Sequence, residues 1–392
     1  MREGWKKSRL NDVVWFQRGF DLPKDQFQEG NIPVFGSTSI LGYHNISKVK
    51  APGVITGRSG SLGKFQIAKE DFWPHNTTLW VKDFKGNDVL FCYYMLQCLD
   101  FAILNTGGAV PTLNRNLLNS FVINLPPLET QRKIASILSS YDDLIENNLK
   151  RIKLLEEKAQ RTYEEWFVKM RFPGYETAVF DEVTGLPEGW EKKSLGELVS
   201  LQQGFALNKK SDHYISMERT NFPLLKIGDL FNEAESLFVK DTIPKQFLVN
   251  KNEIIYSRTG QVGHAFMGRK GVIYNNCFRV TANQRIERIV LFYFLISPSI
   301  VETAKSLATG AAQPDLNHGA FKSIKINLAP LDIQKKFSLQ FEQNLEIIYN
   351  LKKQNRLLKE ARDILLPRLM SGMIDVENIV IQNKEPKELQ NT

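Results

Sequence analysis

Two glycine-rich stretches carry the side chains of this sequence that could do chemistry. The first, GRSGSLGKF, spans residues 57–65, and the second, SRTGQVGHAF, spans residues 257–266. A phosphate-binding P-loop needs a glycine, four residues and then Gly-Lys-Ser/Thr, because backbone N–H groups wrap the phosphates and the hydroxyl holds magnesium. The first stretch has Arg58 in place of the leading glycine and Phe65 in place of the hydroxyl, and the second replaces the lysine with His264. These substitutions argue against a nucleotide site.

Both stretches instead place an arginine beside a hydroxyl residue in a glycine-rich turn that directly follows an apolar strand. A guanidinium held outward in such a turn can donate two hydrogen bonds to guanine O6 and N7, and its polar neighbours can contact bases or phosphates. The candidate DNA-contacting residues of the two turns are Arg58, Ser59, Ser61, Lys64, Arg258, Thr259, Gln261 and His264. The alternative is that each arginine is an ordinary turn residue paired to a carboxylate.

Further polar residues that could contact DNA follow each of the two arginine turns, and others precede the first turn. Amides and hydroxyls can hydrogen-bond to adenine or hold phosphates, although the same residues also close turns. The segment from Gly36 to Asn45 is either a loop at a groove of DNA or a plain pair of turns. The additional candidate DNA-binding residues are Ser37, Thr38, Tyr43, His75, Asn76, Thr77, Asn275 and Asn276.

The composition indicates a globular chain with a modest positive charge. Its 392 residues carry a net charge of +8, which permits nucleic-acid binding without requiring it, because a binding surface depends on clustering in space. Its three cysteines form no CxxC pair, so the sequence supports neither a disulfide scaffold nor a zinc site. The first residues form no apolar signal core, and the longest apolar run, residues 289–296, is too short to span a bilayer. We therefore expect a cytoplasmic protein without a membrane partner.

The elements that must position these turns are present twice. GWKKSRLNDVVWFQRGFDLPK (residues 4–24) matches GWEKKSLGELVSLQQGFALNK (189–209) at an offset of 185. TGGAVPTLNRNLLNSFVINLPPLETQRK (106–133) matches TGAAQPDLNHGAFKSIKINLAPLDIQKK (309–336) at an offset of 203, with half of the 28 positions identical. The arginine turns match at an offset of 200, so most of the 18 inserted residues precede the second turn. The sequence predicts a duplicated domain, with no short solenoid repeat.

A long helical pattern follows each domain. Apolar positions recur in steps of three and four, as in a coiled-coil seam, and a single helix cannot bury such a stripe alone. The predicted seam positions are Ile134, Leu138, Tyr141, Ile145, Asn148, Ile152, Leu155, Ala159, Thr162 and Trp166 in the first helix, and Phe337, Phe341, Asn344, Ile348, Leu351, Asn355, Leu358, Leu365 and Leu369 in the second. We expect the two helices to pack on each other; the alternative is that each lies on its own domain.

These patterns together predict an α+β fold with two similar globular domains separated by two long antiparallel coiled-coil helices, and with internal pseudo-twofold symmetry. The predicted segments are a first domain (1–127), a central helix (128–172), a second domain (173–330), a C-terminal helix (331–375) and a flexible tail (376–392). Each helix would be roughly 55 Å long at 1.5 Å per residue. That length suits duplex DNA, whose major groove recurs about every 34 to 36 Å.

The order of these parts resembles the specificity (S) subunit of type I restriction-modification systems. The resemblance rests on NLPPLETQRKIA and NLAPLDIQKKF at the helix starts, on the repeated Thr-Gly-x-Ala-x-Pro-x-Leu-Asn, and on LLPRLMSGMID near the end. It implies two target recognition domains, each recognising half of a split double-stranded DNA sequence. It also implies that the helices dock two methyltransferase (M) subunits, which bind S-adenosylmethionine, and that restriction (R) subunits join through the complex.

Sequence motifs favour a DNA-binding subunit over an enzyme. NLPPL (residues 124–128) is similar to the Asp/Asn-Pro-Pro-aromatic run of amino-methyltransferases, but a leucine separates the asparagine from the prolines and no aromatic follows. No glycine-rich loop after a strand suggests S-adenosylmethionine binding, and no Asp/Glu/Lys cluster suggests a metal nuclease. Base-flipping partners would methylate the adenine. Two alternatives remain: a stand-alone two-headed DNA-binding regulator, and a scaffold without DNA affinity.

Overall fold

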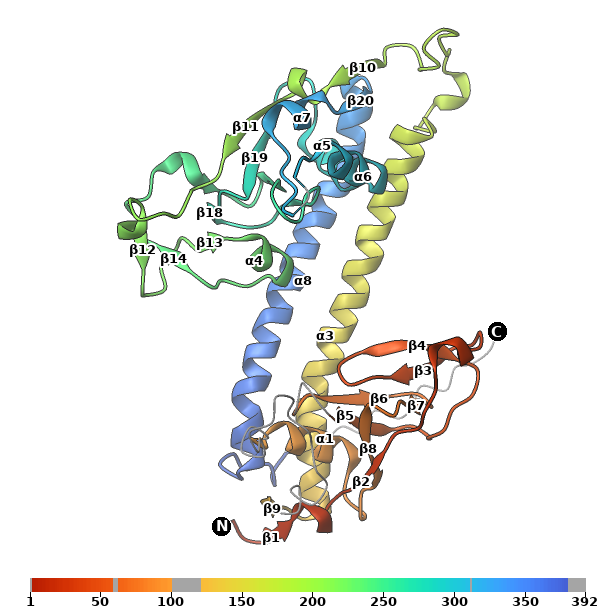
Figure 1. The fold of residues 1–392 in the computed structure, drawn as a ribbon, viewed down its shortest axis with the longest axis vertical. Helices are drawn as coiled ribbons and strands as arrows, with labels where there is room; N and C mark the ends of the chain where they lie inside the picture. The colour runs from red at the N-terminus through yellow and green to blue at the C-terminus, as the bar shows by residue number, and fades with distance from the viewer. Residues whose placement is uncertain (1, 59–62, 101–120, 311, 380–392) are drawn as a thin grey trace. The chain divides into compact units, whose positions relative to one another are not determined.

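The computed structural model describes residues 2–58, 63–100, 121–310 and 312–379 (Figure 1). The chain forms two compact units, Met1–Asn147 with Gln354–Thr392, and Asn148–Lys353. Each unit holds one α+β domain and a part of both long helices, so the units do not coincide with the five segments predicted above. Those segments stay a prediction.

The first domain is built on a four-stranded antiparallel sheet whose central strand, β5, is buried along its whole length. This sheet has the order β2 (Trp15–Arg18), β8 (Thr78–Asp83), β5 (Gly53–Gly57) and β6 (Phe65–Ala68). A three-stranded sheet has the order β4 (Ile40–His44), β3 (Ile32–Phe35) and β7 (Trp73–Pro74), and β1 (Lys6–Arg9) pairs with β9 (Val122–Leu125). Helix α1 (Val89–Gln97) contributes buried Phe91 and Met95 to the core.

The second domain repeats this plan. Its four-stranded antiparallel sheet has the order β11 (Val199–Gln203), β19 (Cys277–Ala282), β16 (Ile254–Ser257) and β17 (Ala265–Phe266). Its smaller sheets are β13 (Leu224–Leu225), β18 (Gly271–Ile273) and β15 (Leu248–Val249); β12 (Ile215–Ser216) with β14 (Phe238–Val239); and β10 (Glu191–Ser194) with β20 (Lys325–Leu328). Its short helices are α4 (Ile227–Asn232), α5 (Arg288–Ile296), α6 (Pro298–Leu307) and α7 (His318–Ser323).

The inserted residues form identifiable elements in the second domain. Strand β12, helix α4 and strand β14 lie between β11 and β16, whereas the fully described segment between β2 and β5 contains only β3, β4 and one turn of 3-10 helix. The apolar run 289–296 forms most of α5, whose side chains are largely buried in the domain core. Within the described ranges, no single helix is long and apolar enough to cross a bilayer.

Each long helix begins at the leucine of its Pro-Pro-Leu or Ala-Pro-Leu segment. Helix α3 (Leu128–Tyr163) has 36 residues and continues into a π-helical turn over Glu164–Val168, so it ends before the predicted limit at residue 172. Helix α8 (Leu331–Met370) has 40 residues.

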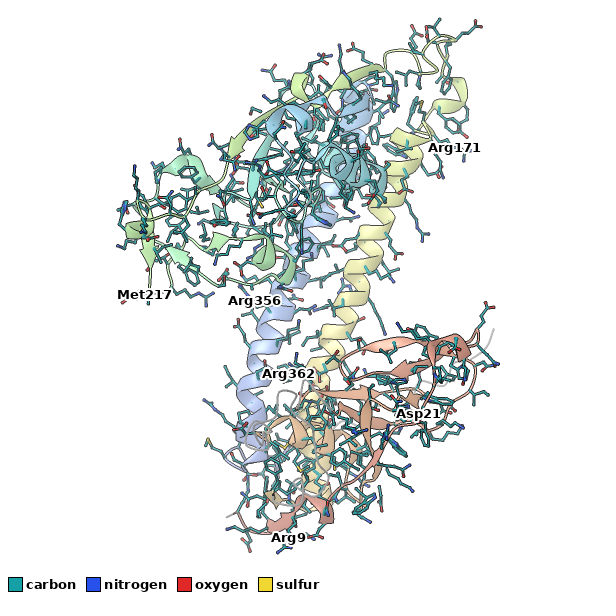
Figure 2. All side chains as sticks on the ribbon, in the orientation of Figure 1. Arg9, Asp21, Arg171, Met217, Arg356 and Arg362 are labelled. Atoms are coloured by element: carbon teal, nitrogen blue, oxygen red, sulfur yellow. The ribbon has the colours of Figure 1, made fainter. Side chains whose placement is uncertain are left out.

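The two helices pack antiparallel within each unit, as predicted (Figure 1). In the first unit, the guanidinium of Arg362, which is labelled in Figure 2, donates to Asp142 Oδ1 at 2.5 Å. Asn355 Nδ2 donates to the Ile145 carbonyl at 3.5 Å. In the second unit, the Tyr163 ring contacts the Phe337 ring with centroids 6.0 Å apart. The alternative of two helices that each lie on their own domain is therefore wrong.

Most of the predicted seam is buried, with shifts of one residue. Tyr163 is buried in place of Thr162, and Leu345 is buried in place of Asn344. A straight α-helix has 3.6 residues per turn, so a strict alternation of three and four drifts by about 20° per heptad around the helix. In α3 the buried stripe has therefore moved to the next residue at Tyr163 and Phe167, whereas in α8 it returns to the predicted positions at Ile348 and Leu351.

Candidate nucleic-acid interface

A glycine in each domain brings two chain segments into direct contact. A Cβ atom at Gly19, after β2, would lie 2.1 Å from the His75 carbonyl oxygen, and one at Gly204, after β11, would lie 2.2 Å from the Tyr274 carbonyl oxygen. Real Cβ atoms do not approach this closely, so only glycine fits there. The end of each first strand therefore passes directly against the polar turn that follows Trp73 or precedes Cys277.

The arginine turn of each domain is tied to the same polar turn. The Arg58 N–H donates to the Thr77 carbonyl at 2.9 Å, and the Arg258 N–H donates to the Asn276 carbonyl at 2.9 Å. The structure thus brings together, in both domains, the candidate residues that the sequence placed after two different strands. This convergence is the geometry expected of a binding surface built from loops.

The first domain adds the turn between β3 and β4 to this surface. Ser37 Oγ donates to the Thr77 carbonyl at 3.1 Å, and Thr38 and Tyr43 are exposed. Lys64 is also exposed, and its carbonyl accepts a hydrogen bond from Thr56 Oγ1 at 2.9 Å. The predicted residues Ser59 and Ser61 lie outside the described ranges.

The polar turn of the first domain holds its own side chains in a hydrogen-bonded network. His75 Nδ1 lies 3.0 Å from Thr77 Oγ1, and Asn76 Nδ2 donates to Asp21 Oδ1, a residue labelled in Figure 2. Arg18 Nε donates to the Asn76 carbonyl at 3.4 Å. Arg18 and Asp21 were not predicted as site residues.

The side chains of Arg18 and Arg58 in the first domain are available to a ligand. Arg18 is exposed, Arg58 is half-buried, and neither forms an ion pair with any described carboxylate. The repeated segment, where QRGF aligns with QQGF, already placed Arg18 beside the glycine of the first domain.

In the second domain, Arg258 pairs with a carboxylate, which is the alternative that the sequence left open. Its guanidinium donates to Asp315 Oδ2 at 2.5 Å and to Gln203 Oε1 at 3.0 Å. Thr259 Oγ1 also donates to Asp315, at 2.5 Å from Oδ1. The Arg258 Nε–H is buried without a partner among the described residues, so the donors left for a ligand are the second N–H groups of the two terminal nitrogens.

The remaining candidates of the second domain differ in how far they reach solvent. Gln261 is exposed, whereas Asn275 and Asn276 are half-buried. His264 packs edge-on against Phe231 with ring centroids 4.9 Å apart, and burial, followed by the positive charge of Lys305, lowers its pKa. The lowered pKa favours the neutral form of His264, whereas the first turn has Lys64 at this position.

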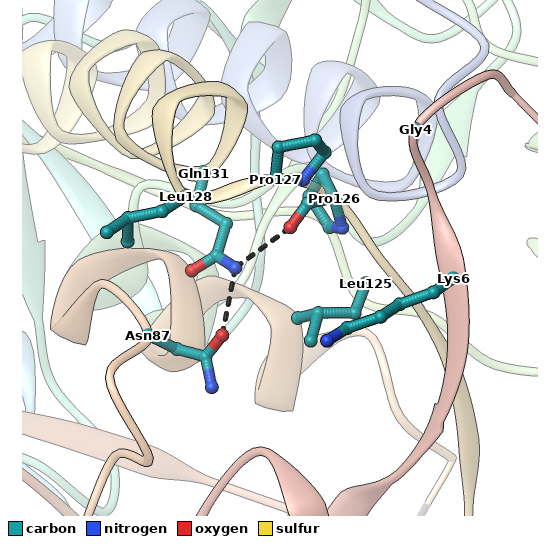
Figure 3. A pocket seen from close by; sticks show the side chains of 8 residues that line it. All are labelled: Gly4, Lys6, Asn87, Leu125, Pro126, Pro127, Leu128 and Gln131. Atoms are coloured by element: carbon teal, nitrogen blue, oxygen red, sulfur yellow. Dashed lines mark hydrogen bonds between the residues drawn. The ribbon is translucent and has the colours of Figure 1, made fainter.

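Metal-ligand groups and pockets are the other features of the described residues that could mark a site. The described ranges contain no group of three His, Cys, Asp or Glu side chains that could hold a metal ion. A pocket of about 350 Å³ lies at the start of α3 (Figure 3), and it is lined by Gly4, Lys6, Asn87, Leu125, Pro126, Pro127, Leu128 and Gln131. Its central side chain, Gln131, is occupied with structural hydrogen bonds to Asn87 Oδ1 and the Pro126 carbonyl.

Comparison with known proteins agrees with this duplicated plan. The sequence model of the type I restriction modification DNA specificity domain matches residues 2–157 and 187–360. The MjaVIII specificity subunit of Methanocaldococcus jannaschii is 26% identical over 408 residues, covering 96% of this chain and 94% of that protein. The MjaIX specificity subunit of the same organism is 28% identical over 288 residues, covering 70% of this chain and 66% of that protein.

A solved structure supports the fold. The crystal structure of the type I restriction-modification system S subunit from M. genitalium matches with a TM-score of 0.64 at 18% identity, covering 93% of this chain and 96% of that one. The family match extends over each repeated domain and into each long helix. This chain belongs to the type I restriction modification DNA specificity domain family.

Proposed function

We propose that this chain recognises a bipartite sequence in double-stranded DNA, one half-site with each domain, and directs associated subunits to that site. The observation that carries the proposal is the repeated geometry: in both domains an arginine turn is hydrogen-bonded to a polar turn through a main-chain bond of 2.9 Å. Guanidinium, amide and hydroxyl groups are the side chains that hydrogen-bond to base edges and phosphates.

We assign methylation and cleavage to partner subunits rather than to this chain. The relatives are named as specificity subunits of type I restriction enzymes. The candidate interface offers hydrogen-bond donors and acceptors, which suit binding. The partners would be two methyltransferase subunits, which bind S-adenosylmethionine and methylate adenine, together with restriction subunits. Because such a complex acts on the DNA of the cell, we place it in the cytoplasm.

The long helices offer a surface for the methyltransferase subunits. Within the first unit, Leu144 of α3 and Leu357 and Ile364 of α8 are each about half exposed, although both helices already bury one apolar stripe. Exposed apolar groups beyond those that a helix pair needs are typical of a protein interface. We therefore infer that the helix pair docks these partners.

Binding selection tests this proposal. The full chain, purified together with the methyltransferase subunits of its host, is mixed with duplexes whose centre is randomised, and the bound fraction is sequenced. We expect enrichment of two short sequences at a fixed spacing, with affinity that falls as salt rises. A scaffold without DNA affinity would enrich nothing, and a stand-alone regulator would enrich the same motif at equal affinity without the partner subunits.

A further inference from the structure

We propose that Asp315 is a positioning residue that fixes the Arg258 guanidinium for a base contact and cancels its charge, so that Arg258 supplies sequence discrimination without general affinity for phosphates. This inference rests on the proposed DNA-recognition function. In this inference, Arg258 contacts one base of the second half-site, and Asp315 makes that contact selective by holding the guanidinium in place.

The Arg258 side chain is held from two directions before any ligand arrives. Asp315 accepts from one terminal nitrogen at 2.5 Å, and Gln203, at the end of β11, accepts from the other at 3.0 Å. The Arg258 side chain is only 20% exposed. A guanidinium with this support loses little conformational entropy when it binds, and the remaining N–H donors of its two terminal nitrogens keep a fixed direction, while its Nε is buried. Fixed direction is what a paired contact with guanine O6 and N7 requires.

Asp315 is itself held by main-chain bonds on both sides. Its N–H donates to the Thr309 carbonyl at 2.8 Å, and its carbonyl accepts from the Thr309 N–H at 3.0 Å. The adjoining residues close on the arginine turn, because the Gly260 N–H donates to the Pro314 carbonyl and the Leu316 N–H donates to the Arg258 carbonyl, both at 2.9 Å. Residues 314–316 of the repeated segment therefore lie against the arginine turn.

The Asp315 carboxylate stays charged at neutral pH. Burial opposes its ionisation, but hydrogen bonds from Thr259 and Arg258 and the charge of Arg258 together lower its pKa below the usual value. The pair therefore carries no net charge. A free arginine that neutralises one phosphate steepens the salt dependence of binding by about 0.9 in log–log slope, whereas a neutral pair adds little.

The sequence of the first domain has no counterpart of the Asp315 carboxylate or of the Gln203 amide. Arg18 stands at the position of Gln203, and Thr112 stands at the position of Asp315. The first domain therefore places two arginines where the second has one arginine, one amide and one carboxylate. At these positions, the first domain carries more positive charge, and the second makes a contact that is more selective for one base.

The test is Asp315→Asn in the full chain with its methyltransferase subunits, assayed by selection from the randomised duplexes at several salt concentrations. The amide keeps the size of the side chain but removes the charge that balances Arg258. We expect discrimination at one base pair of one half-site to fall roughly 5- to 150-fold, the value of a bidentate contact. Affinity for non-cognate duplexes should rise, and the salt slope should steepen by about 0.9.

Glu165→Gln is the matched control. Glu165 pairs with Lys169 at 2.6 Å in the π-helical turn after α3, so its loss changes the net charge equally but leaves the arginine turn intact. We expect its half-site discrimination to match that of the unsubstituted chain. If Asp315→Asn enriches the same motif with the same discrimination and salt slope as this control, Asp315 has no such role. If the unsubstituted chain enriches no motif, the proposed function itself fails.

Arg258→Lys separates positioning from simple loss of folding. Lysine keeps the charge and an ion pair with Asp315, but it cannot also reach Gln203 and a base with a planar fork. We expect this variant to bind non-cognate duplexes at the original salt slope while it loses discrimination at the same base pair as Asp315→Asn. Unchanged discrimination in Arg258→Lys would overturn the proposal even if Asp315→Asn did not fold.

Discussion

At the scale of single residues, the two domains use similar turns with different charge. The first presents Arg18 and Arg58 without a described carboxylate partner, and the second neutralises Arg258 with Asp315. Counterion release makes unpaired cations the main source of affinity for any DNA sequence. At these turns, general affinity for DNA should therefore come largely from the first domain.

Arg58→Ala should weaken binding to all duplexes evenly. We expect the log–log salt slope to become shallower by about 0.9, because one phosphate contact is lost, with little change in the enriched motif. Lys82→Ala removes the same charge from an exposed residue at the far end of β8 and serves as the control. Loss of preference at a single base pair would show instead that Arg58 contacts a base, and an unchanged slope would remove it from the interface.

Part of this site could be predicted from sequence. The arginine turns and the polar turns were identified because they recur at matching places in the two repeats. Arg18 and Gln203 were missed, since their contacts depend on close chain approaches at Gly19 and Gly204 that residue spacing does not reveal. Asp315 was missed because its segment meets the arginine turn through main-chain bonds between residues more than 50 positions apart in the sequence. The packing of His264 on Phe231 was not predicted, because Phe231 lies in the inserted segment, which has no counterpart in the first repeat.

At the scale of elements, one glutamine at the start of each long helix joins that helix to its own domain. Gln131, 2% exposed, accepts from the Asp88 N–H at 3.0 Å and donates to the Pro126 carbonyl at 3.0 Å. Gln334 repeats this arrangement, accepting from the Glu287 N–H at 2.9 Å and donating to the Ala329 carbonyl at 2.7 Å. Each amide ties the first turn of a long helix to the start of α1 or α5.

Gln131→Ala should lower the free energy of unfolding by about 1 to 3 kcal/mol, because buried main-chain groups lose their partners. The measurement is urea unfolding of the full chain, with the neighbouring exposed residue replaced in Arg132→Ala as the control. Equal stability of the two variants would show that water replaces the glutamine at no cost.

The helices themselves were largely predictable, because their starts follow proline and their apolar period is regular. The seam position at Thr162 was wrong by one residue, since the α-helical period is not 3.5, and the position at Asn344 was wrong because the steps of three and four around it occur in the opposite order. The π-helical turn over Glu164–Val168 ended α3 early, and no residue in that segment marks such a turn by type.

At the scale of the whole molecule, a domain followed by a long helix occurs twice in the chain. Each long helix needs a second helix to cover its apolar stripe. Ile134 and Leu138 of α3 pack in the first unit with Leu365 and Leu369 of α8. A fragment that ends at residue 172 removes α8 and leaves this stripe uncovered.

We expect the fragment of residues 1–172 to dimerise through α3 and to bind a palindrome of the first half-site. Sedimentation at micromolar concentration measures its mass, and binding selection gives its motif. The matching fragment with Leu138→Lys should remain monomeric, because it places a charge in the seam. A monomeric unsubstituted fragment would contradict helix-on-helix pairing as the reason that the chain carries two long helices.

The central claim, that this chain sets the DNA sequence on which a methyltransferase acts, is tested most directly by methylome sequencing of host cells with and without its gene. We predict a bipartite motif with methyladenine and a fixed spacer that disappears when the gene is deleted and returns when it is restored. An identical set of methylated sites in both cell lines, with the methyltransferase subunits expressed, would contradict the account.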